Sequence, residues 1–293
     1  MRLQILHKES LPFVIFLNRI SKLKKQRGRM KILILSLLFC SQVYAVEKLV
    51  LTGSSTIAPV LSDIAKSFEK KNSNFRIDVQ TGGSSRGVND ARKKLNDIGM
   101  VSRKLKDSEK DLSVYTIAKD GIALITHSEN SISSLTETQV KQIYRGRIKN
   151  WKEVGGQDAA IVVVNKAEGR STLELFLKFF KLKNSEINAS VVIGDNEQGI
   201  KAVARNPNAI AYVSIGTAEF NQSVGTPIRL LDFKGVKASV KNVENGSYPI
   251  SRELNLVTKD KPNSTAKLFI DYVLSKDASS IIREHYFVPV LKK

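Results

Sequence analysis

The sequence predicts an α/β protein whose sheets are mostly parallel and flanked by helices. From residue 48 onward, short apolar runs of strand length alternate with segments in which apolar residues recur at helical spacing. Strands and helices that alternate in this way form parallel sheets covered on both faces. The 293 residues, 42% of them apolar, suffice for two modest domains with sizeable cores.

The predicted elements follow one another without an internal repeat or a low-complexity linker. Apolar residues at every second position, as in Phe75, Ile77 and Val79, or in short unbroken runs, predict the strands. Apolar residues three and four positions apart, as in Leu173 and Phe176, predict the helices. The predicted strands cover 48–52, 75–79, 98–101, 160–164, 209–213 and 254–257, and the predicted helices cover 59–70, 88–95, 173–180 and 264–274.

We assign residues 1–45 as a leader that contains a secretory signal peptide at 30–45. This segment has a basic start, a short apolar core and Ala45 at the cleavage point, and its core is too short to span a bilayer. Residues 1–29 are either an over-extended start before Met30 or a long basic signal region. The protein is therefore expected to be periplasmic or secreted.

The single cysteine, Cys40, falls inside this signal. Phe39 precedes it where a lipoprotein signal needs a small residue, so lipid modification is disfavoured. Cleavage after Ala45 would leave a mature protein without cysteine. A disulfide framework, a thiol nucleophile and a cysteine-ligated metal are then excluded.

The formal net charge of +19 is partly explained by the leader, which holds nine basic residues and one acid. The rest of the chain has 38 basic and 27 acidic residues, a net charge of +11. The excess is spread along the sequence without a nucleic-acid-binding motif, so no nucleic-acid partner is expected. Such a field attracts anions in general, whether small oxyanions or an anionic surface.

Three predicted strand-to-helix junctions combine glycine with serine or threonine, at residues 52–56, 81–87 and 167–172. Glycine lets a backbone approach a ligand closely, and hydroxyls either cap the helix or bind an oxyanion. Unpaired N–H groups at a helix start favour anions, and parallel strands bring such loops to one edge of the sheet. Each loop alone is more often a plain helix cap. Three together, two of them with arginine, favour an anion site, although none matches a nucleotide-binding motif.

Several motifs, in a fixed order, resemble the substrate-binding proteins of bacterial phosphate ABC transporters. They are Thr-Gly-Ser-Ser-Thr-Ile-Ala-Pro (52–59), Gly-Gly-Ser-Ser-Arg-Gly-Val (82–88), Asp-Ile-Gly-Met-Val-Ser-Arg (97–103), Asp-Gly-Ile-Ala (120–123), Ile-Tyr-Arg-Gly-Arg-Ile-Lys-Asn-Trp (143–151), Ala-Ile-Ala-Tyr-Val-Ser (209–214), Tyr-Pro-Ile-Ser-Arg (248–252) and Phe-Val-Pro-Val (287–290). The resemblance covers about residues 48–290, nearly the whole mature chain.

The resemblance implies a two-lobed periplasmic-binding-protein clamshell that closes on phosphate and delivers it to a membrane permease. We place lobe one at 46–125 plus 245–293 and lobe two at 126–244, with two crossover strands as the hinge. The implied protein is a monomer without a cofactor or metal, and it is not an enzyme.

The candidate phosphate ligands lie in the three loops and after the third strand. Those that match the family's motif by position are Thr56, Ile57, Ser84, Ser102, Arg103, Lys166, Arg170, Ser171 and Thr172, and the loops add Ser54, Ser55, Ser85 and Arg86. Asp120 is a further candidate.

Two departures from the family pattern affect this site. The third loop usually reads Gly-Ser-Gly-Thr with an arginine shortly before it, whereas here Lys166 takes that place and Arg170 lies inside the loop. We expect Arg170 to hold the anion and Lys166 to be solvated at the cleft rim. Some members also place an aspartate where Ser102 stands, to accept the proton of hydrogen phosphate. Asp120 is either its substitute or a turn residue.

Three other functions stay open. The first alternative is a protein of the same kind that binds another tetrahedral oxyanion, sulfate or molybdate, instead of phosphate. A secreted hydrolase would use Ser171 with Lys166 as nucleophile and base, helped by His127 or His285. His127 follows an apolar strand, as a surface or hinge residue does, and no carboxylate stands at a motif spacing from His285. A protein that binds an anionic surface would lose its binding as salt rises, unlike a closed cleft.

Overall fold

The computed structural model describes residues 46–291, and the predicted leader lies outside the described residues. From Glu47 onward the chain forms one compact unit. Its strands are β1 (Glu47–Gly53), β2 (Phe75–Thr81), β3 (Ile98–Val101), β4 (Ser113–His127), β5 (Val162–Lys166), β6 (Val191–Ile193), β7 (Ala209–Ser214), β8 (Ile228–Leu230), β9 (Ser251–Thr258) and β10 (Val288–Pro289).

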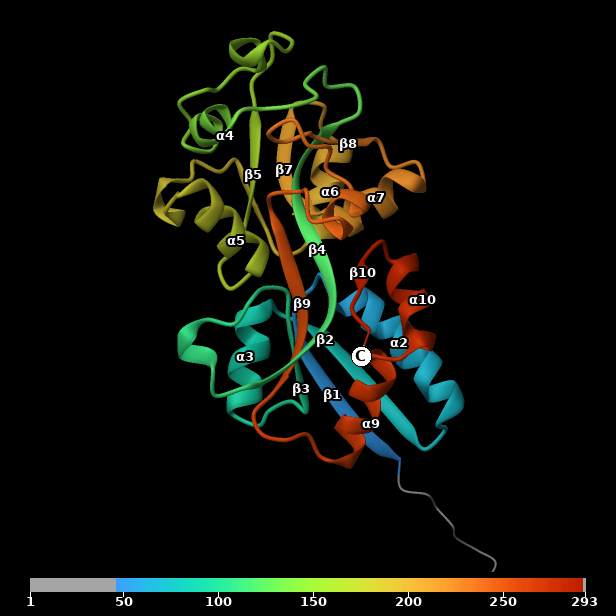
Figure 1. The fold of residues 1–293 in the computed structure, drawn as a ribbon. Helices are drawn as coiled ribbons and strands as arrows, with labels where there is room; N and C mark the ends of the chain where they lie inside the picture. The colour runs from blue at the N-terminus through green and yellow to red at the C-terminus, as the bar shows by residue number, and fades with distance from the viewer. Residues whose placement is uncertain (1–45, 292–293) are drawn as a thin grey trace, which may run out of the picture. The chain divides into compact units, whose positions relative to one another are not determined.

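Helices flank these strands (Figure 1). They are α2 (Ala58–Lys71), α3 (Ser84–Arg92), α4 (Glu137–Tyr144), α5 (Ser171–Phe180), α6 (Asn196–Ala204), α7 (Ile215–Ser223), α8 (Val240–Glu244), α9 (Ser264–Val273) and α10 (Lys276–Glu284), with short 3-10 turns η1 (Asp107–Glu109), η2 (Trp151–Val154) and η3 (Asn184–Glu186). Among the residues described, no helix is both long and apolar enough to cross a membrane.

The strands join in the order β2-β1-β3-β9-β4-β7-β5-β6, with β8 and β10 also paired to β4. The outer pairs of this order are parallel, as the sequence predicts. The centre differs, because β4 and β9 run antiparallel to each other and to their neighbours. Figure 1 shows these two long strands side by side through the middle of the fold.

The two central strands connect two separate hydrophobic cores. Ala118 of β4 and Leu254 of β9 belong to the core built on β1, β3, α2 and α9. Ile122 of β4, and Ile250 just before β9, belong to a second core that contains Trp151 and the aromatic face of α5. The chain thus passes from one core to the other within β4 and returns at the start of β9. We call the part of the protein built around the first core lobe one and the part built around the second core lobe two.

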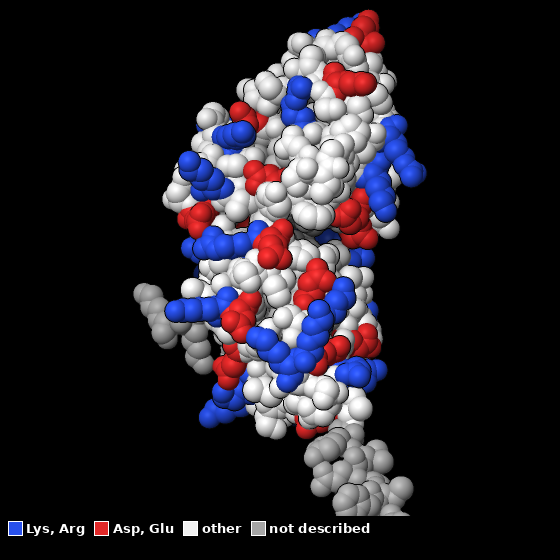
Figure 2. Space-filling model, turned by 90° about the vertical axis from the view of Figure 1, so that its right-hand side faces the viewer, with Lys and Arg blue, Asp and Glu red and all other residues white. Residues whose placement is uncertain are grey.

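Charged side chains of both signs lie on the face that is drawn in Figure 2. On the face that Figure 2 shows, basic and acidic side chains lie interspersed, and no broad area of that face is basic alone. On this face the charges therefore do not form the continuous basic stripe of a nucleic-acid-binding surface.

Candidate anion-binding site

The first loop is held in place by a close approach of two backbones. Gly53 ends β1 at φ 136°, and a Cβ there would lie 2.3 Å from the carbonyl oxygen of Met100 on β3. Only glycine fits this contact. Ser54 N–H donates to the same oxygen over 2.9 Å, and the turn that follows leads into α2. The side chain of Ile57 packs in the core of lobe one, so only its backbone belongs to the loop.

The second and third loops meet across the gap between the lobes. Gly83 at φ 91° precedes α3, and a Cβ there would lie 2.5 Å from the carbonyl oxygen of Gly169. Ser85 N–H donates to that oxygen over 3.3 Å. The third loop leads from β5 into α5, which begins at Ser171. The lobes are therefore closed against each other in this conformation.

The three loops and the end of β3 line a small pocket. Nine of the predicted ligands line it together with two glycines. The lining residues are Ser54, Ser55, Thr56, Gly83, Ser84, Ser102, Lys166, Arg170, Ser171, Thr172 and Gly194. Ser171 Oγ is buried and has no hydrogen-bond partner among the described residues. A buried hydroxyl without a partner is costly unless a ligand or water satisfies it, so this atom points to an occupant.

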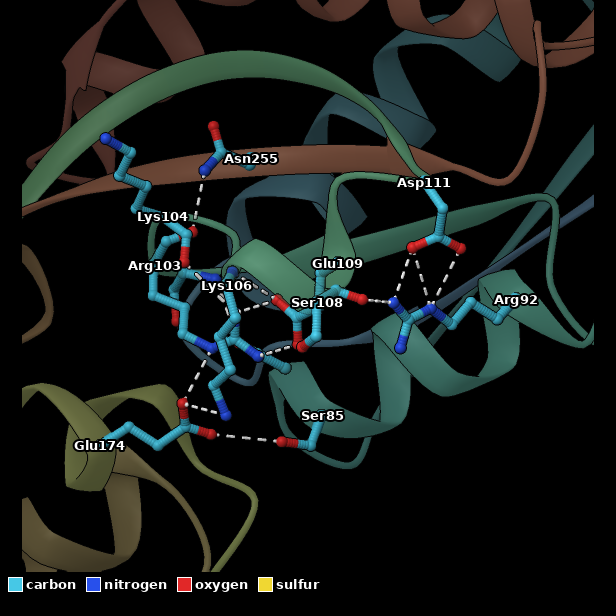
Figure 3. A network of polar contacts seen from close by, with 12 residues as sticks. Ser85, Arg92, Arg103, Lys104, Lys106, Ser108, Glu109, Asp111, Glu174 and Asn255 are labelled. Carbon is cyan, nitrogen blue, oxygen red and sulfur yellow. Dashed lines mark hydrogen bonds and ion pairs between the residues drawn. The ribbon is translucent and has the colours of Figure 1, made fainter.

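Two of the arginines predicted as ligands, Arg86 and Arg103, do not line the pocket. Arg86 turns back on its own lobe and donates to Thr81 O, Gln80 Oε1 and Asp90 Oδ2 over 2.7–3.1 Å. Arg103 is buried, and its guanidinium forms ion pairs with two carboxylates, at 2.6 Å with Glu109 and at 3.0 Å with Glu174 (Figure 3).

Glu174 also accepts a hydrogen bond from Ser85, another of the predicted ligands. The Ser85 hydroxyl donates to Glu174 Oε1 over 3.3 Å, and Lys106 lies 3.0 Å from the other carboxylate oxygen (Figure 3). Ser85, Lys106 and Arg103 belong to lobe one, whereas Glu174 lies in the first turn of α5. These residues therefore bridge the lobes beside the pocket rather than line it.

The expectation that Lys166 is solvated at the rim is wrong. Its side chain is buried, the residue is 3% exposed, and Nζ donates to the carbonyl oxygen of Asp195 over 2.9 Å. Burial, helped by the neighbouring charges of Arg252 and Arg170, lowers the pKa of Lys166 from 10.5 to about 7, while the charge of Asp195 opposes this shift. Arg170 is only half-buried.

Asp120 is neither a proton acceptor facing the pocket nor a turn residue. It lies within β4, and its Oδ2 accepts from Nε and Nη2 of Arg252 over 3.0 and 2.7 Å. Its Oδ1 accepts from Gly216 N–H over 3.3 Å, at the start of α7. Both of its oxygens are thus occupied within the protein.

Two polar residues behind the pocket, Arg252 and Asn196, are not among the ligands predicted from the sequence. Arg252 donates to Thr56, Ser102 and Thr172, and Asn196 Nδ2 donates to Thr56 Oγ1 over 3.1 Å. Arg252 lies in the Tyr-Pro-Ile-Ser-Arg motif, which was a sequence signal for it. Asn196, the first residue of α6 after the Asp195 cap, carries no comparable signal.

Comparisons with known proteins show the family to which the chain belongs. Residues 43–277 match the model of the PBP superfamily domain. The phosphate-binding protein PstS of Bacillus subtilis is 30% identical over 247 residues, which cover 83% of this chain and 80% of the Bacillus protein. The chain belongs to the PstS family of the PBP superfamily.

Solved structures extend the comparison to the fold. A phosphate ABC transporter substrate-binding protein of Clostridium perfringens, solved with bound phosphate, is 36% identical with a TM-score of 0.77. The alignment covers 83% of this chain and all of that protein. An ABC-type phosphate transport receptor of Vibrio cholerae is 27% identical with a TM-score of 0.66, over 83% of this chain and 99% of the receptor. The two-lobed fold predicted for the PstS family is thereby confirmed.

Proposed function

We propose that this protein captures inorganic phosphate in the pocket between its lobes and delivers it to an ABC importer. The observation that carries the proposal is the buried cluster of hydroxyls from both lobes around Lys166. Seven serine and threonine residues line that pocket together with Lys166 and Arg170. The family membership, and the bound phosphate of the Clostridium protein, support phosphate as that anion.

The expected affinity requires many donors at once. Micromolar binding corresponds to about 8 kcal/mol, whereas one charge-assisted hydrogen bond contributes about 1.5–3 kcal/mol. We assign the anion contacts to Thr56, Ser84, Ser102, Ser171 and Thr172, with charge supplied by Lys166 and Arg170. The backbone N–H groups at the starts of α3 and α5 would complete the shell.

The lobe boundaries belong to the proposal as well. The exchange of cores within β4 and at the start of β9 supports a hinge there. It favours lobe boundaries near Gly121 and Ser251, a few residues away from the boundaries predicted between residues 125 and 126 and between residues 244 and 245. Binding would close lobe two on lobe one about these strands.

We infer that the protein is exported, cleaved after Ala45, and works outside the cytoplasm with a membrane permease, without an enzymatic activity of its own. Mass spectrometry of the exported protein should find Val46 as its first residue. A mature chain that begins at a lipid-modified Cys40, or at Met1, would contradict this processing.

Calorimetric titration of the purified protein with phosphate, sulfate and molybdate tests the ligand. We expect phosphate to bind in one-to-one stoichiometry and more tightly than the other two. Binding of sulfate or molybdate in preference to phosphate would replace the proposed ligand by another oxyanion. No binding of any of the three would remove the anion-binding function.

A further inference from the structure

The guanidinium of Arg252 has all five of its N–H groups engaged within the protein. Nε donates to Asp120 Oδ2, and Nη2 donates to the same oxygen and to Thr56 Oγ1 over 3.2 Å. Nη1 donates to Thr172 Oγ1 over 3.1 Å and, over 3.4 Å, to the carbonyl and hydroxyl oxygens of Ser102. A guanidinium carries five N–H donors and no acceptor, so none of the five is left to reach an anion in the pocket.

The three hydroxyls that accept these bonds line the pocket and come from three separate segments. Thr56 precedes α2, Ser102 follows β3, and Thr172 lies in the first turn of α5. Thr56 and Ser102 belong to lobe one and Thr172 to lobe two, so Arg252 joins both lobes through the oxygens that would face an anion.

A hydroxyl has one proton, and an oxygen that accepts an N–H must direct that proton elsewhere. Thr56 Oγ1 accepts from Asn196 as well as from Arg252, which occupies both of its lone pairs. Ser102 Oγ accepts from the Ser54 hydroxyl over 2.9 Å as well as from Arg252. Because the protein occupies the acceptor side of these oxygens, their protons point to the open side, which is the pocket.

We propose that Arg252 is a positioning residue that turns the hydroxyls of Thr56, Ser102 and Thr172 toward the pocket as donors. An anion in the pocket then meets hydrogen-bond donors rather than lone pairs. This role rests on the proposed function, since it concerns the same pocket.

The charge of Arg252 is not what the pocket uses. The guanidinium and the Asp120 carboxylate are both 1% exposed and lie 2.7 Å apart, so they form a neutral pair. A lysine at this position would keep the charge and could keep the ion pair. A single ammonium cannot also reach three hydroxyls on three segments, because it lacks the planar fork of a guanidinium.

The Arg252→Lys variant separates charge from geometry. We expect it to fold and to lose phosphate affinity by about 10- to 100-fold, measured by calorimetry. The same titration of Thr172→Val and of the double variant Arg252→Lys/Thr172→Val completes a double-mutant cycle. If Arg252 acts through the Thr172 hydroxyl, the double variant loses at least about twofold less than the product of the two single losses.

Arg229→Lys is the matched control, because Arg229 on β8 is also bonded to carbonyl oxygens, those of Asn130 and Ser128, and does not line the pocket. Its phosphate affinity should stay within about twofold of wild type. Should Arg252→Lys fail to fold, the neutral replacement Arg252→Gln with Asp120→Asn serves in the same cycle.

The possible results distinguish the positioning role of Arg252 from the proposed function in phosphate binding. Wild-type affinity in Arg252→Lys, or additive losses in the cycle, would overturn the positioning role while phosphate binding by the wild-type protein stands. Failure of the wild-type protein to bind phosphate would instead remove the proposed function, and the role of Arg252 with it.

Discussion

Lys166 is a buried amine close to two other cations, and its charge depends on pH in the neutral range. Its pKa of about 7 lies below the 10.5 of an exposed lysine. Between these two values the unfolded chain binds a proton that the folded, ligand-free protein does not. The stability of the ligand-free protein should therefore rise with pH across this window, and the cost of the buried charge should be fully present below about pH 7.

Burial favours the neutral form of the Lys166 amine, whereas an anion bound beside it favours the charged form. We expect binding above neutral pH to take up a proton, and affinity to fall by up to about tenfold per pH unit. Calorimetry in buffers of different ionisation enthalpy, at about pH 8, measures this uptake. Lys166→Arg stays charged and is the control, since the titration of phosphate itself is common to both proteins. Equal proton uptake in the two proteins would contradict the assignment.

The burial of Lys166 also reverses the order expected from the sequence for the two cations of the third loop. Removing a buried charge from an anion site typically costs about 2–5 kcal/mol, a loss of about 30- to 4000-fold. We expect a loss of this size for Lys166→Met. Arg170→Met should cost less and should mainly change the salt dependence, since Arg170 is half-buried. Titration of both variants at two salt concentrations decides the order, and a larger loss in Arg170→Met would restore the original expectation.

At the level of residues, the sequence located the loops because glycine and hydroxyls at a strand-to-helix junction have a local cause. It could not locate contacts made by distant segments. Arg252 and Thr56 lie 196 positions apart, and Asn196 and Thr56 lie 140 apart. One of the two carboxylate partners of Arg103, Glu174, is equally non-local, because it comes from the other lobe.

Among the helices, α5 has two functions at its first turn. Ser171 and Thr172 line the pocket, whereas Glu174 reaches across to Arg103, Lys106 and Ser85 of lobe one (Figure 3). The Glu174 side chain is 26% exposed, so water screens these contacts only partly. The same turn thus contributes to the anion shell and to the closed arrangement of the lobes.

We expect Glu174→Gln to weaken phosphate binding without touching the pocket. Losing the bridging charge should destabilise the closed form by about 1–2 kcal/mol, or five- to thirtyfold in affinity, mainly through faster release. Stopped-flow displacement measures the release rate. Glu137→Gln on α4 is the control, because Glu137 pairs with Lys141 and Lys234 within lobe two. Unchanged release in Glu174→Gln would show that the bridge does not hold the lobes closed.

The sequence predicted β1, β2, β3, β5, β7 and β9 and the helices α2, α3, α5 and α9 to within a few residues, because their apolar patterns are local, but it did not predict the edge strand β6 or the helices α4, α6 and α7. Predicted strand 98–101 coincides with β3, and 48–52 lies inside β1. It did not predict β4 as one strand of 15 residues, or its antiparallel pairing with β9. Lys119 and Asp120 interrupt the apolar run of β4 where the strand crosses between the cores, and which strands pair is set by the tertiary fold.

At the scale of the whole protein, the lobes are joined by two β-strands and by polar contacts around the pocket. Several of those contacts converge on atoms that an anion would also use, as at Thr56 and Thr172. Without an anion, the buried Lys166 and the unpartnered Ser171 hydroxyl lack compensation in the closed form, which favours opening and hydration. With an anion the same groups favour closure, so the ligand shifts the equilibrium between the two forms.

We therefore expect small-angle scattering to give a smaller radius of gyration with phosphate than without it. Closure should depend on donors from both lobes, because either lobe alone supplies an incomplete shell. The Thr172→Val variant tests this dependence: at phosphate concentrations that saturate it, its radius should stay larger than that of the wild-type complex. Thr226→Val, on the loop before β8, removes a hydroxyl from lobe two that does not line the pocket and should close like wild type. A radius that does not change on confirmed binding would mean that phosphate enters a site that is already closed, and the hinge at β4 and β9 would then have no part in capture.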